Sequence, residues 1–215
     1  MDSAYRYSIC VSGAAGGASV EESEDLARRV GAAIARRGHL TVTGATVGLP
    51  YFAAQGAKQA GGMSIGYSPA ATVREHLRKY RLPCNYFDYI SYTGSHYMGR
   101  DLIMINSVDA TVCVGGRLGT LNEFIMSVEQ RKPVGVLLES GGSSDVISQL
   151  LDVLQPQFKN LVVFDSNPEY LIEKITNVLD EEYKDIKSEL TVCIDWTVEE
   201  SLKKSEKKSF KTHAG

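Results

Sequence analysis

Short apolar segments alternate with amphipathic helical segments along most of this 215-residue chain, and this alternation constrains the fold more than any other feature. Helical spacing is clearest where Leu26, Val30 and Ile34 recur on one face of a single segment. We predict helices over residues 21–37, 49–60, 100–107, 120–130, 145–154 and 168–179. We predict core strands within residues 7–11, 40–43, 63–67, 86–92, 109–114, 133–138 and 161–164.

A regular β-α-β-α order is typical of a parallel sheet, because each strand needs a crossover helix before the next parallel strand. The chain is therefore predicted to form a Rossmann-like, doubly wound α/β fold, with a mostly parallel sheet and helices on both faces. The core pattern ends near residue 180. We expect a nucleotide-binding domain over residues 1–180 and a C-terminal extension over 181–215, with one strand near 190–198 and a mobile, lysine-rich tail.

The composition argues against several classes of protein. A net charge of −3 gives no general attraction to nucleic acid or to anionic membranes, so neither is an expected partner. No apolar segment approaches the roughly 20 residues of a membrane span, and no signal-peptide pattern opens the chain, which favours the cytoplasm. The four cysteines form no C-x-x-C pair, so we expect no metal site.

Glycine-bearing loops follow three of the predicted strands. Carboxyl ends of parallel strands meet at one edge of a sheet, and ligands of such folds bind there. The three loops therefore predict one site that holds a phosphate or a nucleotide. Its predicted binding residues are Ser12, Gly13, Gly44, Gly48, Gly115, Gly116, Gly119 and Thr120.

The third loop, from Gly115 to Thr120, lies between an apolar strand and a helix. Glycines let the backbone approach a phosphate closely, and the N-terminus of the following helix favours an anion. Glu123 follows Thr120 by about one helical turn and is expected to face the same pocket. The alternative is a purely structural turn in which Thr120 and Glu123 form a capping box.

The sequence Gly-Gly-x-x-Gly-Thr-x-x-Glu at residues 115–123 resembles the signature of the LONELY GUY (LOG) family within the SLOG group of nucleotide-binding proteins. The resemblance extends roughly from Tyr5 to Leu179, and Arg100 has the spacing of the family's catalytic arginine. It implies a homodimer that cleaves the N-glycosidic bond of a nucleoside 5′-monophosphate. Arg100 and Glu123 would then be catalytic, and the partner would be that nucleotide or a related phosphorylated small molecule.

That chemistry is physically coherent, because a carboxylate such as Glu123 can stabilise an oxocarbenium-like transition state. The Arg100 guanidinium could anchor the phosphate or stabilise the leaving base. A surface ion pair with Asp101 is the alternative for Arg100. We expect no resident cofactor and no lysine decarboxylase activity, since no lysine lies in or beside the glycine loops to hold pyridoxal phosphate.

The chain departs from the family signature at several positions. Two residues, Arg117 and Leu118, separate the glycine pair from Gly119 where the family has one. Met98 and Asp101 replace a histidine and a basic residue. Two further hypotheses therefore stay open. One is a non-catalytic nucleotide- or cofactor-binding carrier of the same fold, and the other is a nucleotide-sensing interaction module that uses the tail.

Two further features have a structural and a functional interpretation. Residues 68–83 show neither helical nor strand periodicity. The segment could cover the pocket and bring Arg74 or His76 near the ligand. The alternative is that its arginines are simply solvated. Apolar helix side chains such as Ile103 and Met104 give weak support to a homodimer.

Overall fold

The computed structural model describes residues 5–154 and 156–187, and residues 6–183 form one compact unit. A seven-stranded sheet in the order β4-β3-β2-β1-β5-β6-β7 lies at its centre, and every neighbouring pair is parallel. The prediction of a Rossmann-like α/β fold is confirmed. The strands are β1 (Ser8–Gly13), β2 (Leu40–Thr43), β3 (Met63–Ser68), β4 (Tyr89–Tyr92), β5 (Ala110–Val114), β6 (Val134–Leu137) and β7 (Val162–Asp165).

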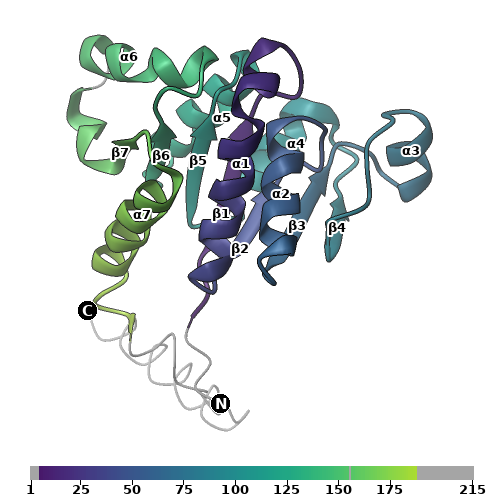
Figure 1. The fold of residues 1–215 in the computed structure, drawn as a ribbon, viewed down its shortest axis with the longest axis horizontal. Coiled ribbons are helices and arrows are strands. Elements are labelled where there is room, and N and C mark those ends of the chain that lie inside the picture. The colour runs from purple at the N-terminus through teal and green to yellow at the C-terminus, as the bar shows by residue number, and fades with distance from the viewer. Residues whose placement is uncertain (1–4, 155, 188–215) are drawn as a thin grey trace, which may run out of the picture. The chain divides into compact units, whose positions relative to one another are not determined.

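Helices cover both faces of the sheet. In Figure 1, α1, α2 and α7 lie in front of the strands, whereas α4 and α5 lie behind them. Both faces bury apolar side chains: Val30 and Leu171 pack with β1 and β5 on one face, and Met104 and Phe124 belong to clusters on the other. The helices are α1 (Ala18–Arg36), α2 (Leu49–Gln59), α3 (Val73–Arg78), α4 (His96–Asn106), α5 (Leu118–Glu129), α6 (Ile147–Leu154) and α7 (Pro168–Glu182), with 3-10 turns η1 (Gly142–Asp145) and η2 (Pro156–Leu161).

Helices α1 and α2 approach each other closely because two glycines face the neighbouring backbone. A Cβ at Gly31 would lie 2.7 Å from the carbonyl carbon of Ala53, and a Cβ at Gly56 would lie 2.7 Å from that of Arg28. Contacts this short exclude any side chain at either position. The close packing holds α1 and α2, which follow β1 and β2 in the chain, side by side.

Strands β2 to β4 lie on one side of β1 and strands β5 to β7 on the other, and this change of side creates the crevice that holds the site. Strand β1 pairs with β2 on one side and with β5 on the other, so the order of connections reverses there. Gly13 at the end of β1 is in register with Val114 at the end of β5. Loops from both strands therefore leave the sheet at the same height and diverge toward opposite faces, as in other doubly wound folds.

The differences from the sequence-based expectations are shifted element boundaries and one additional helix. Helices α4 and α5 begin four and two residues earlier than predicted, at His96 and Leu118. Helix α3 was not predicted, and Thr72 caps its N-terminus by accepting a hydrogen bond from the Glu75 N–H at 3.2 Å. The strand predicted at 190–198 and the tail lie outside the described residues. None of the described helices is long and apolar enough to cross a membrane.

Candidate functional site

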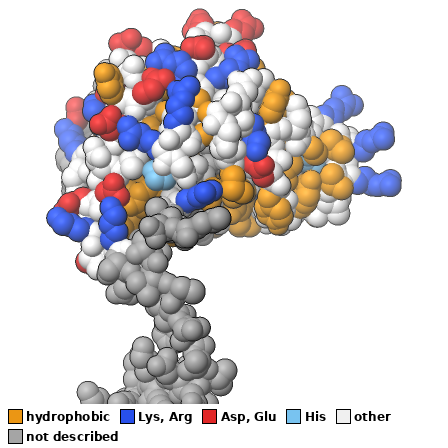
Figure 2. Space-filling model, turned by 60° about the horizontal axis from the view of Figure 1, so that its bottom comes forward, with side chains coloured by type: hydrophobic (Ala, Val, Ile, Leu, Met, Phe, Trp, Pro, Cys, Tyr) orange, Lys and Arg blue, Asp and Glu red, His pale blue; other side chains and the backbone are white. Residues whose placement is uncertain are grey.

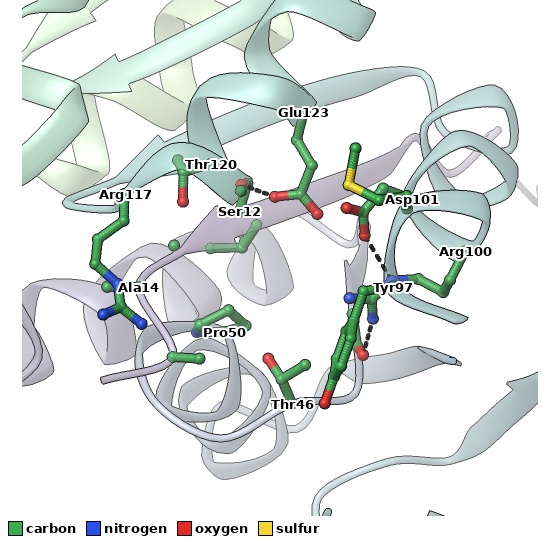
Figure 3. A pocket seen from close by; sticks show the side chains of 16 residues that line it. Ser12, Ala14, Thr46, Pro50, Tyr97, Arg100, Asp101, Arg117, Thr120 and Glu123 are labelled. Carbon is green, nitrogen blue, oxygen red and sulfur yellow. Dashed lines mark hydrogen bonds and ion pairs between the residues drawn. The ribbon is translucent and has the colours of Figure 1, made fainter. Parts of the chain in front are cut away.

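A pocket of about 240 Å³ opens at the carboxyl ends of β1, β2 and β5. Figure 3 shows Thr120 and Arg117 on one side of it and Asp101, Arg100 and Tyr97 on the other. The structure brings seven of the predicted residues together in the lining: Ser12, Gly13, Gly44, Arg100, Gly119, Thr120 and Glu123. The pocket is also lined by residues that the sequence did not single out as binding or catalytic, namely Val11, Ala14, Ala15, Thr46, Pro50, Tyr97, Met98, Asp101 and Arg117.

Helices α2, α4 and α5 begin with residues that line the pocket, and none of them has a side-chain cap. Their N-cap residues are Gly48, Ser95 and Arg117. By contrast, Thr72 and Asn167 cap α3 and α7, which do not line the pocket. First-turn N–H groups have no partner within their own helix. At the start of α2 the Leu49 N–H already has a partner and Pro50 has no N–H, so the first turn of α5 is the helix end that can donate to an anion.

The glycine pair of the third loop lies behind the pocket rather than in its lining. The Gly115 N–H donates to Ser140 Oγ at 2.8 Å, and the Gly115 carbonyl accepts from Ser144 Oγ at 2.7 Å. Gly116 has a φ of 105°, and a Cβ there would lie 2.5 Å from the Thr120 side chain. The pair shapes the turn and places the start of α5, whereas Gly119 and Thr120 reach the pocket.

Gly48, the remaining predicted residue, is also absent from the lining. It has a φ of 80°, and a Cβ there would lie 2.7 Å from Ala15 Cα. The adjoining Leu49 N–H donates to the Ala14 carbonyl at 2.9 Å. Gly48 thus lets the loop after β2 pack against the loop after β1, which lines the pocket.

Glu123 comes from the second turn of α5 and is only 8% exposed. Its carboxyl group accepts a hydrogen bond from Ser12 Oγ at the end of β1. Burial, together with the nearby Asp101 carboxyl group, raises the pKa of Glu123 to about 7. The alternative of a Thr120–Glu123 capping box is wrong, because α5 begins at Leu118 and Thr120 lies inside its first turn.

Arg100 is 4% exposed, and protein groups bind much of its guanidinium. Its Nε donates to Asp101 Oδ1 at 2.7 Å, and Nη1 donates to the carbonyls of Tyr67, at 2.7 Å, and Gly44. The ion pair with Asp101 therefore forms, but it is buried and not on the surface. A Cβ at Gly44 would lie 2.7 Å from Arg100 Cζ, so Gly44 leaves room for the guanidinium.

Asp101 is the main site residue that the sequence reasoning assigned to another role. Its carboxyl group faces that of Glu123 (Figure 3), and its pKa is raised by burial despite the neighbouring Arg100. Asp101 precedes Met104 and Ile105 by three and four residues, on the buried stripe of α4. An acid on such a stripe is a signal that sequence reading could have used.

These groups form one polar cluster across the pocket floor. Ser12 donates to Glu123 at one end, and Arg100 donates to Asp101 and to the backbone at the ends of β2 and β3 at the other. The carboxyl groups of Glu123 and Asp101 face each other between these bonds (Figure 3). Two buried carboxyl groups this close favour the protonated form of one of them. The opposite wall presents the N-terminus of α5 and the Arg117 cation.

Residues 68–83 do not contribute to the pocket. His76 is buried, and its Nδ1 and Nε2 atoms lie 2.8 Å from Ser68 Oγ and 2.9 Å from the Pro83 carbonyl oxygen. Arg74 is exposed on α3, and neither residue lines the pocket. Within the described residues, no group of three or more His, Cys, Asp or Glu side chains could hold a metal ion.

The fold and the site together define a Rossmann-like α/β protein with a polar pocket at the switch point of its sheet. The chain belongs to the SLOG cluster4 family, whose family model matches residues 6–172. The more specific resemblance to the LOG family stays a prediction.

Similar proteins include both uncharacterized and cofactor-binding ones. An uncharacterized protein of Archaeoglobus fulgidus is 34% identical over 117 residues, which are 54% of this chain and 72% of that protein. The molybdenum cofactor binding protein of the phototrophic bacterium Rippkaea orientalis is 30% identical, with a TM-score of 0.68 over 82% of this chain and 99% of that one. The molybdenum cofactor carrier protein of Chlamydomonas reinhardtii is 26% identical, with a TM-score of 0.66 over 81% and 99%.

Proposed function

We propose that this protein binds and carries a phosphate-bearing cofactor of the molybdenum-cofactor type and does not hydrolyse a nucleotide. One observation carries the proposal: the two residues expected to be catalytic, Glu123 and Arg100, are hydrogen-bonded to protein groups in the buried polar cluster that also includes Asp101. The similarity to molybdenum cofactor proteins over nearly their whole length supports the same conclusion. The protein would carry this molecule as a cargo and would not keep it as a cofactor for a reaction of its own.

The pocket wall formed by α5 suits a phosphate. Gly119 and Thr120 lie in the first turn of this helix, where N–H groups lack partners within the helix. Arg117 adds a positive charge at the pocket rim. The molybdenum cofactor is a pterin derivative that carries a phosphate group, so this wall fits one end of it. A nucleoside monophosphate would present the same group and is the alternative ligand.

The pocket floor fits a hydrolase less well. A carboxylate that stabilises an oxocarbenium-like transition state has to be ionised. Burial and the Asp101 carboxyl group instead raise the pKa of Glu123 to about 7, which favours its neutral form. Two backbone carbonyls and Asp101 bind Arg100, so its role is to position the floor.

We also propose a homodimer that uses the outer surfaces of α4 and α5. Leu118 is 82% exposed and Ile125 is 45% exposed on α5, and Leu102 and Ile103 are exposed on α4. A cluster of exposed apolar side chains on neighbouring helices is typical of an interaction surface. Met104, which the sequence also suggested, belongs to the core and is fully buried, so it cannot contribute.

The test is to incubate the purified protein with isolated molybdenum cofactor and, separately, with a panel of nucleoside 5′-monophosphates. Pterin fluorescence retained after gel filtration reports binding, and chromatography reports free base. We expect retained cofactor and no base. Release of base that falls about 100-fold in Glu123→Gln would instead support the hydrolase.

A further inference from the structure

Basic side chains gather around helix α3. We define the β4–α3 surface as Arg74, Arg78, Lys79, Arg81 and Tyr89, all of which are exposed. Residues 73–81 contain these four cations and a single acid, although the whole chain has a net charge of −3. Figure 2 shows Lys and Arg side chains projecting from the right-hand end of the molecule, where Figure 1 places α3, beside hydrophobic side chains.

The positive charge of this surface is mostly uncompensated. Lys79 lies 3.7 Å from Glu75 in an exposed ion pair. Arg74, Arg78 and Arg81 form no ion pair with any residue that the structure describes. Three exposed guanidinium groups are therefore available to a negatively charged partner.

The same surface includes the open edge of the sheet. Strand β4 is the last in the strand order, and in the described part of the chain only β3 pairs with it. Tyr89 on this strand is 63% exposed. An open edge presents unpaired backbone donors and acceptors, which match another extended polypeptide. Exposed tyrosines are frequent anchors at protein interfaces.

Helix α3 is held at the carboxyl end of β4. The His76 ring of α3 packs edge-on against the Tyr92 ring at a centroid distance of 5.8 Å, and His76 Nδ1 lies 2.8 Å from Ser68 Oγ at the end of β3. A peptide that extends the sheet beside β4 would therefore reach the arginines of α3 at one end.

From this arrangement we propose that the β4–α3 surface binds an extended acidic segment of a partner protein, which adds to the sheet beside β4. The guanidinium groups complement its carboxylates, and the edge of β4 supplies backbone donors and acceptors at the spacing of an extended polypeptide, which a nucleic acid does not match. The chain's own segment 203–211 contains five lysines and one acid, so it does not complement this surface.

The β4–α3 surface is connected to the pocket rim by aromatic contacts. The Tyr80 hydroxyl, just after α3, lies 2.9 Å from His96 Nδ1 at the start of α4. The rings of Tyr80 and Tyr97 are 5.6 Å apart, and Tyr97 lines the pocket. A partner bound at α3 would thus lie beside the pocket, where a carried ligand would enter or leave. The peptide-binding proposal itself does not depend on the identity of that ligand.

Fluorescence anisotropy with a labelled peptide, Glu-Val-Glu-Ile-Asp-Val-Glu, tests the proposal on the full chain. Matched probes are a peptide with Lys at each acidic position, a peptide with Pro in place of Ile, and an oligothymidylate of equal charge. We expect the acidic peptide to bind and to protect β4 amides from hydrogen exchange. The proline peptide should bind at least tenfold more weakly, because it lacks an N–H and resists strand geometry.

The charge-reversed variant Arg74→Glu with Arg78→Glu should bind the acidic peptide about tenfold more weakly and should gain affinity for the lysine peptide. Arg6→Glu with Arg36→Glu is the control, because it changes the net charge equally at exposed positions elsewhere. An equal loss in this control, tighter binding of the oligothymidylate, or no peptide binding at millimolar concentration would each overturn the proposal.

Discussion

The buried carboxyl groups of Glu123 and Asp101 face each other across the contact between α5 and α4 (Figure 3), and the Asp101 carboxyl group raises the pKa of Glu123. Ser12 donates to one end of this pair and Arg100 to the other. Two acids buried together cannot both ionise easily, because each charge opposes the other and burial opposes both. The protonation state of the pair therefore changes with pH, and the free energy of unfolding should change with it.

The first prediction concerns the pH dependence of stability. The pKa of Glu123 rises from an ordinary 4.5 to about 7 on folding, so the folded state binds more protons than the unfolded state between these values. The free energy of unfolding should therefore fall as the pH rises from about 4.5 to 7, and this effect should level off above pH 7. Its upper limit is about 3 kcal/mol for a shift of this size.

Replacing Glu123 with Gln removes the titrating group but keeps an amide that can bond to Ser12 and Asp101. Relative to the wild type, Glu123→Gln should gain about 1–3 kcal/mol of stability between pH 5 and pH 8 in urea unfolding. Glu129→Gln, at an exposed position of the same helix, should show no such gain. A stability difference for Glu123→Gln that does not change with pH would contradict the prediction.

The second prediction concerns Gly44 and Arg100. A methyl group at residue 44 would overlap the guanidinium, so Gly44→Ala should displace Arg100 and destabilise the protein by about 1–3 kcal/mol. The effects of Gly44→Ala and Arg100→Ala should be non-additive in a double-mutant cycle, because both disturb the same contact. Gly16→Ala is the matched control, since a Cβ there meets no atom within 4 Å. Additive effects would show that the two positions act independently.

Local pattern was sufficient to predict the sheet and most of the helices. Buried parallel strands such as β5 are continuous apolar segments, and the glycine loops mark where they end. The joint role of Arg100 and Asp101 was harder to predict, because adjacent residues on a helix normally point in different directions. Their pairing depends on the Gly44 carbonyl, 56 residues away in the sequence, which holds the guanidinium. Contacts of this kind leave no local pattern.

The third prediction tests the proposed homodimer. Ile125→Asp places a charge in the exposed apolar surface of α4 and α5, where a partner subunit would bury it. We expect light scattering to give a dimer mass for the wild type and a monomer mass for this variant at micromolar concentration. Val153→Asp, on the exposed side of α6, should leave the mass unchanged. A monomeric wild type would refute the dimer.

The last prediction separates stability from ligand binding at the start of α5. Gly119 lines the pocket, and a Cβ at this position meets no protein atom within 4 Å. Gly119→Ala should therefore leave the fold intact and could stabilise it by up to about 1 kcal/mol, because alanine favours the helix. The added methyl group would nevertheless occupy space beside the first-turn N–H groups, and binding of inorganic phosphate should weaken at least tenfold by calorimetry. Gly16→Ala, outside the lining, should bind phosphate normally. Unchanged phosphate affinity in Gly119→Ala would show that the anion binds elsewhere.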